Sequence, residues 1–234
     1  MKALDWGESG GRIGLGMGEE EMLNTRALLA LTEALRSGAL RAGQFLSMPQ
    51  LVEILRVPIA AVREATRHGQ VSGWLDVIPK RGVQILEAEP ATIRDSLDLR
   101  MVLDQEGARR WIRGGLDAGE LAALRQAHER MRETVRGAGT PELSAQAIQV
   151  DLSLHDFLAR GLGNPMLRAD YESNRIRIAI FQRVRPFVQE RVRSAMEEHL
   201  AIIAALERRD SAATTDAIAY HCERTQHWWG VSPA

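Results

Sequence analysis

The sequence is poor in cysteine, because Cys222 is the only one among 234 residues. A single cysteine cannot form a disulfide within the chain, which fits a reducing compartment. It also excludes a zinc site built from several thiolates. Any metal ion would therefore be bound by histidine and carboxylate side chains.

Long apolar runs are also missing. No stretch of about 18 apolar residues is present that could span a bilayer, and the N-terminus lacks the basic-then-apolar pattern of a secretory signal. We therefore expect a cytoplasmic protein that does not contact membranes.

The chain has little net charge, with a formal value of −1. Residues 22 to 88 carry eight Lys or Arg against five Asp or Glu, whereas residues 1 to 21 carry two against five. This mild basicity of the first folded segment permits DNA binding but does not by itself indicate it.

The composition that is present, 45% hydrophobic and 26% charged residues, is typical of a globular protein with a packed core. Residues 1 to 21 are rich in glycine and end in three glutamates, which predicts a flexible arm.

Leu28, Leu31 and Leu35 then recur at helical spacing, which predicts a helix from residue 23 to about 40 that ends near Gly38.

Two short helices and a hairpin follow. Ser47 precedes a helical apolar pattern, and a second such pattern begins after Pro58. Residues 74 to 78 and 83 to 86 read as two strands around a basic turn. The order of three helices and a hairpin is that of a winged helix-turn-helix, which we place at residues 22 to 88.

Residues 89 to 234 carry only helical periodicity, so the predicted fold is mainly α, with an all-helical bundle after the winged helix. Capping residues and prolines at first helical positions mark the helix starts. The helices are predicted at residues 91 to 113, 117 to 137, 141 to 161, 165 to 181, 184 to 208 and 211 to 229.

Four polar residues lie on faces of these helices that are otherwise apolar. Asp151 and His155 are four residues apart, one turn along the same face. His199 and His221 each lie on an apolar stripe of a later helix. Three helices would thus direct these side chains into one core.

Burying a carboxylate and three imidazoles without partners would cost several kcal/mol. A divalent cation removes that cost, and nitrogen and oxygen ligands suit zinc first, then nickel, manganese or iron. The alternative is that each histidine is a core residue bonded to a backbone carbonyl. His68, His128 and His227 are expected not to be ligands, and His128 is expected on a charged helix face.

Several motifs resemble the GntR family of bacterial regulators, specifically its FadR-like subfamily with a helical, FCD-type ligand-binding domain. The resemblance covers roughly residues 25 to 228. The motifs are Val62-Arg63-Glu64-Ala65, Pro79-Lys80-Arg81-Gly82-Val83, Arg100-x-x-Leu103-Asp104, Asp151-x-x-x-His155, Gly163-Asn164-Pro165 and Glu198-His199-x-x-Ile202.

The resemblance implies a homodimer that binds double-stranded operator DNA and responds to a small carboxylate effector near the metal. It assigns the metal to Asp151, His155, His199 and His221. Arg100 and Arg175 are candidates to bind the effector, although both could equally form salt bridges between helices.

The second helix of the motif would lie in the major groove. Arg63 is the candidate for reading a base, because arginine can bond bidentately to guanine. Arg67, Lys80 and Arg81 are candidates for phosphate contacts.

The sequence departs from the family at Pro58-Ile59-Ala60-Ala61, where a Ser-Arg-x-Pro stretch is usual, so an arginine that commonly contacts DNA is missing. Two alternatives to a working regulator therefore stay open. One is a metal- or metabolite-binding helical protein with weakened DNA binding. The other is a metal-dependent enzyme, although no HExxH-like base, nucleophile elbow or phosphate loop occurs in the sequence, and we expect no enzymatic activity.

Overall fold

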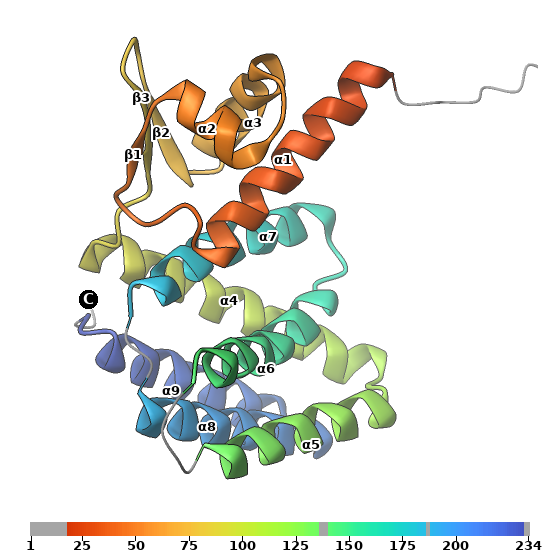
Figure 1. Ribbon diagram of the computed structural model, residues 1–234. Helices are drawn as coiled ribbons and strands as arrows, with labels where there is room; N and C mark the ends of the chain where they lie inside the picture. Colours follow the sequence, from red (N-terminus) through yellow and green to blue (C-terminus); the bar gives the residue numbers. More distant parts are fainter. Residues whose placement is uncertain (1–17, 136–139, 186–187, 232–234) are drawn as a thin grey trace, which may run out of the picture.

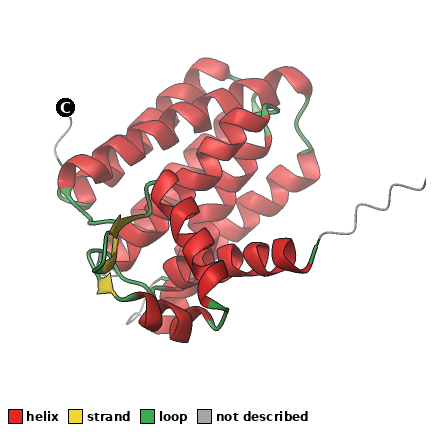
Figure 2. Ribbon diagram, turned by 90° about the horizontal axis from the view of Figure 1, so that it is seen from above, coloured by secondary structure: helices red, strands yellow, loops and turns green. Residues whose placement is uncertain are grey.

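The computed structural model describes residues 18–135, 140–185 and 188–231. Over these residues the chain forms nine helices and three short strands. Figure 1 shows helices α1 to α3 and the strands above a group of helices α4 to α9, and Figure 2 shows how strongly helices dominate. The predicted mainly α fold, a winged helix-turn-helix followed by a helical bundle, is confirmed. No helix in the described residues is long and apolar enough to cross a membrane.

The N-terminal part contains three helices and one three-stranded sheet. The helices are α1 (Glu19–Ser37), α2 (Met48–Leu55) and α3 (Ile59–Val71), and the strands are β1 (Phe45–Leu46), β2 (Leu75–Ile78) and β3 (Gly82–Ile85). The strands are antiparallel in the order β1-β3-β2, so the predicted hairpin β2-β3 is extended by β1. A two-residue strand is too short to produce an alternating pattern, which is why the sequence did not indicate it.

Helix α1 begins earlier than the sequence predicted. Glu19, Glu20 and Glu21 form its first turn, where their negative charges face the positive end of the helix dipole. The predicted arm is therefore wrong for these three residues, and the arm's residues 1–17 lie outside the described part. The helix ends as expected at Gly38, whose φ of 82° is left-handed.

Gly69 lets α3 pack closely against its neighbours. A Cβ at this position would lie 3.1 Å from Cδ2 of Leu75 in β2 and 3.3 Å from Cδ2 of Leu31 in α1. Glycine is unfavourable inside a helix by about 1 kcal/mol relative to alanine. Here the close approach of α1, α3 and β2 explains why a glycine stands inside the helix.

Six helices form the C-terminal bundle, with bounds close to those predicted. They are α4 (Pro90–Gly114), α5 (Ala118–Thr134), α6 (Pro141–Arg160), α7 (Pro165–Arg183), α8 (Gln189–Glu207) and α9 (Ser211–Trp228). Side chains of Asp117, Thr140, Asn164 and Asp210 accept hydrogen bonds from the first-turn amides of α5, α6, α7 and α9.

Helices α4 and α6 are in unusually close contact. A Cβ on Gly107 of α4 would lie only 2.1 Å from the backbone oxygen of Leu158 in α6. Four residues on, the indole Nε1 of Trp111 donates to the backbone oxygen of Phe157 at 2.8 Å, and the two rings stack. This contact fixes α4 against α6, and the two helices carry part of the candidate site.

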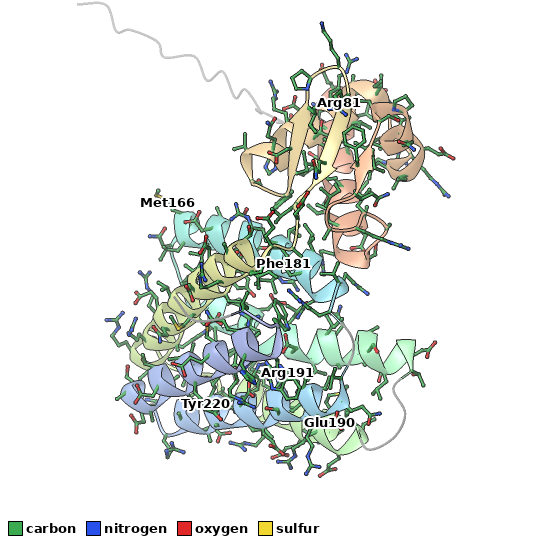
Figure 3. All side chains as sticks on the ribbon, turned by 90° about the vertical axis from the view of Figure 1, so that its left-hand side faces the viewer. Arg81, Met166, Phe181, Glu190, Arg191 and Tyr220 are labelled. Atoms are coloured by element: carbon green, nitrogen blue, oxygen red, sulfur yellow. The ribbon has the colours of Figure 1, made fainter. Side chains whose placement is uncertain are left out.

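The N-terminal part rests on α7 and α4, and one hydrophobic cluster runs across the junction. Phe181 of α7 is fully buried there, and Figure 3 shows it where the two parts meet. The Trp74 indole donates to the Ser173 carbonyl at 3.0 Å, and the Arg177 guanidinium donates to the Ser72 carbonyl at 2.8 Å. The end of α3 is thereby bonded to α7.

Candidate metal centre

Three histidines from three helices converge in the bundle. His155 of α6, His199 of α8 and His221 of α9 each offer a ring nitrogen, and these atoms lie within 4.8 Å of one another. All three side chains are buried. The Nε2 atoms of His199 and His221 are 3.2 Å apart. Helical spacing alone predicted these inward positions, and the packing of α6, α8 and α9 brings them to one point.

Two buried carboxylates orient two of the rings. Asp104 of α4 accepts a hydrogen bond from Nδ1 of His155 at 2.7 Å, and Glu198 accepts one from Nδ1 of His221 at 2.7 Å. Because an ionised carboxylate only accepts, each Nδ1 carries the proton. Both Nε2 lone pairs therefore face the centre of the cluster. The sequence analysis did not identify either carboxylate as part of the site.

His128 orients the third ring, and its predicted place on a charged helix face is wrong, because it is fully buried. Its Nδ1 donates to the Leu124 carbonyl at 2.7 Å. Its Nε2, 3.1 Å from Nδ1 of His199, must then be the acceptor, so the His199 Nε2 lone pair also faces the centre. The buried series Leu121, Leu124, His128 and Met131 has helical spacing and was a signal in the sequence that could have placed this histidine inside.

Asp151, the fourth predicted ligand, lies between the imidazoles and a cavity. Its Oδ1 is 3.7 Å from Nε2 of His199, and its Oδ2 accepts a long hydrogen bond of 3.4 Å from Gln182. Burial opposes ionisation of this carboxyl, but the electrostatic influence of the neighbouring His155 and Arg100 side chains outweighs burial and lowers the Asp151 pKa below its usual value. The structure thus brings the four predicted ligands into one region, while their binding to a metal stays a prediction.

The donor set fits a divalent cation. Nε2 of His155 is buried without a hydrogen-bond partner. Burial and neighbouring imidazoles hold the pKa of His199 and of His221 well below the ordinary value, so both rings are neutral and keep their lone pairs at neutral pH. Two such lone pairs 3.2 Å apart repel unless a proton or a cation lies between them. Three imidazoles and a carboxylate are ligands that zinc and its first-row neighbours accept.

A cavity of about 240 Å³ adjoins the cluster at Asp151. Its polar lining includes the buried Arg100 of α4, Arg183 as the last residue of α7, and Arg185 two residues after that helix. The hydrophobic lining comes from Ala147, Ile148, Val188, Val192, Ala195, Met196 and Trp229. A small molecule with an anionic group and an apolar part fits such a lining.

Arg175, the other residue predicted to bind an effector, is not among the residues that line this cavity. Its guanidinium forms two hydrogen bonds with Asp156, at 2.6 and 2.8 Å. The Tyr171 hydroxyl donates to the same carboxylate. For Arg175 the structure therefore shows the salt bridge between helices that was the alternative reading.

The four residues predicted to contact DNA line one shallow groove in the N-terminal part. Arg63 and Arg67 lie on α3, and Arg67 is paired with Glu64 of the same helix at 2.5 Å. Lys80 and Arg81 lie in the turn between β2 and β3, and Figure 3 shows Arg81 far from the bundle. Basic groups from a helix and a hairpin thus share one surface.

Comparison with models of protein families identifies the domain in the C-terminal part. The model of the FCD domain matches residues 95–224, more than half of the chain. The chain belongs to the FCD-domain family. A comparison of this FCD-domain protein with curated proteins found no match.

Solved structures of similar fold include regulators. E. coli McbR/YncC matches with a TM-score of 0.73 and 20% identity, over 89% of this chain and 97% of that one. A protein described as a GntR transcriptional regulator from Rhodococcus sp. RHA1 matches with a TM-score of 0.73 and 19% identity, over 90% and 99%. Together with the FCD domain, these matches confirm the predicted resemblance to GntR-type regulators with a helical C-terminal domain.

Proposed function

We propose that this FCD-domain protein is a DNA-binding transcriptional regulator that responds to a small organic acid bound beside a divalent metal ion. The observation that carries the proposal is the convergence of three imidazole Nε2 atoms next to a cavity that contains Arg100. This arrangement lies in a chain whose other part has a winged helix-turn-helix fold.

His155, His199 and His221 would hold the ion, with Asp151 as a fourth ligand, and zinc is the metal that best suits this set. When bound, such an ion supplies an electrophilic centre that attracts a carboxylate oxygen of the effector. Arg100 supplies a second positive charge in the same cavity. Its burial strengthens its interaction with an anion, since little water competes.

In the DNA-binding part we propose that α3 enters the major groove, with Arg63 reading a base. Arg67, Lys80 and Arg81 would contact phosphates and position the domain. A homodimer would present two such helices to half-sites about one helical turn apart. An effector changes DNA affinity only if it binds the two dimer conformations unequally.

Fluorescence anisotropy on the chain's own promoter DNA and on random DNA tests the regulator. We expect a clear preference for the promoter, and Arg63→Ala should reduce it by about tenfold, as expected for loss of one bidentate base contact. Arg193→Ala is the control, because Arg193 is an exposed arginine of the bundle paired with Glu197. Equal weak binding to both DNAs would contradict the regulator and favour a metabolite-binding protein or a metal-dependent enzyme.

Metal analysis of the purified protein tests the centre. We expect about one divalent ion per chain in the wild type and a clear loss in His199→Ala, because the His199 ring contacts both of the other imidazoles. Stoichiometric metal in the variant would remove His199 from the ligand set.

A further inference from the structure

Arg183, the last residue of α7, and Arg185, two residues later, border the cavity without a carboxylate partner among the described residues. Arg183 is exposed and Arg185 is half-buried, so both lie on the solvent side of the cavity, whereas Arg100 is buried within it. Nε of Arg185 is buried and has no hydrogen-bond partner. A buried guanidinium N–H without an acceptor is costly, and an anionic ligand group would satisfy it.

The charges of the cavity do not balance. Arg191 is paired with the buried Glu198 at 3.0 Å, and the charge of Arg100 lowers the pKa of Asp151. No carboxylate of the described residues that line the cavity pairs with Arg183 or Arg185. A ligand with one carboxylate held at the metal and Arg100 would leave these two arginines uncompensated. A second anionic group on the same ligand would neutralise them.

Arg183 also contacts the DNA-binding part. Its Nε donates a hydrogen bond to the backbone oxygen of Arg36, in the last turn of α1, at 3.0 Å. Its aliphatic carbons pack at the turn that follows α1, since a Cβ on Gly38 would lie 3.4 Å from Cδ of Arg183. One side chain thus borders the ligand cavity and bonds to α1.

We infer that Arg183 and Arg185 form a second anion-binding subsite, and that the effector is a small dicarboxylate rather than a monocarboxylate. Its second carboxylate competes with the Arg36 carbonyl for the Arg183 guanidinium. Binding therefore releases the contact between α7 and α1 and changes how the DNA-binding part is held. This inference rests on the proposed organic-acid effector and adds its class and its route to the DNA.

The volume of the cavity limits the size of the effector. About 240 Å³ lies below the usual range of roughly 300 to 1,000 Å³ for ligand pockets. Straight-chain dicarboxylates of three to six carbons are small enough to be suitable probes.

Calorimetric titration of the zinc-loaded full chain tests the subsite. The probes are the dicarboxylates from malonate to adipate, each compared with the monocarboxylate of equal carbon number, from propanoate to hexanoate. We expect at least one dicarboxylate to bind about tenfold or more tightly than its partner. The double variant Arg183→Gln/Arg185→Gln should lose this preference. Arg193→Gln removes an exposed charge of the same bundle and should retain it.

Anisotropy on promoter DNA tests the transmission. The best dicarboxylate should change the DNA affinity of the wild type. Arg183→Gln without ligand should bind DNA as the ligand-saturated wild type does, and added dicarboxylate should change its affinity less than twofold. An Arg183→Gln variant that still responds like the wild type overturns the role of the Arg183 contact.

The outcomes separate the subsite from the proposed function. Equal binding of dicarboxylates and monocarboxylates, or a preference that survives in the double variant, overturns the subsite and leaves the organic-acid effector standing. Binding of neither class overturns the organic-acid effector and the subsite with it.

Discussion

His128→Leu is the substitution whose effect follows most directly from the site geometry. In the wild type, Nε2 of the buried His128 accepts the proton on Nδ1 of His199 at 3.1 Å. Leucine has a similar volume but no acceptor. The substitution therefore leaves a buried N–H of His199 without a partner while the packing changes little.

Two separate effects are expected, one on folding and one on metal binding. The unsatisfied N–H should lower the free energy of unfolding of the metal-free protein by about 1 to 3 kcal/mol. The His199 ring also loses the contact that fixes its proton on Nδ1. Loss of a residue that orients a ligand typically lowers metal affinity by about 10- to 100-fold, which equals about 1.4 to 2.8 kcal/mol of binding free energy.

Zinc affinity by competition with a chromogenic chelator, and denaturant unfolding of the metal-free protein, measure the two effects. His128→Gln is the matched control, because the glutamine amide oxygen can occupy nearly the position of Nε2 and restore the acceptor. We expect it to recover most of the zinc affinity. If His128→Leu binds zinc as tightly as the wild type and unfolds at the same denaturant concentration, His128 does not orient the site.

Three further predictions concern the fold and its response to pH. The metal-free protein should lose stability as pH falls below about 6.5, because His199 and His221 have lowered pKa values when folded and take up protons more readily when unfolded. At pH 5.5, each ring that stays neutral in the folded state lowers the free energy of unfolding by about 1.4 kcal/mol relative to alkaline pH. Urea unfolding at several pH values measures this loss, and a free energy of unfolding that does not change with pH would contradict it. Gly107→Ala should lower the melting temperature by about 10 °C, because the new Cβ would clash with the Leu158 carbonyl and reduce the stability by about 3 kcal/mol. Calorimetry measures the melting temperature, and an unchanged value would mean that α4 and α6 can move apart at no cost. Arg177→Ala removes the guanidinium that holds the end of α3 to α7, so amide exchange in the last turn of α3 should speed up several-fold, and unchanged exchange would mean that the contact does not stabilise that turn.

The sequence by itself determined the elements of the fold. Helix bounds in the bundle came within a few residues of the structure because capping residues and prolines act locally, within one turn. The same local physics explains the error at Glu19, where a run of glutamates reads as a charged arm but also suits the first turn of a helix. The division into domains at residues 22 to 88 and 89 to 234 stays a prediction, since one hydrophobic cluster crosses that boundary.

The sequence also indicated the inner polar residues of the site. Asp151, His155, His199 and His221 lie on apolar stripes, and periodicity is enough to show that such residues face inward. The homodimer, the metal and the contacts with DNA depend on partners outside the chain, and they remain proposals, as does the FadR-like assignment.

Only the tertiary structure decided which residues surround the three histidines. Asp104 meets His155 across 51 positions of sequence, and His128 meets His199 across 71. Arg175 pairs with Asp156, whereas Arg183 donates a hydrogen bond to the backbone of α1. The helical pattern of the sequence does not distinguish these two arginines. Helix periodicity fixes the face of a side chain but not the neighbour that this face meets. That neighbour depends on how the helices pack, which many weak contacts throughout the chain decide together.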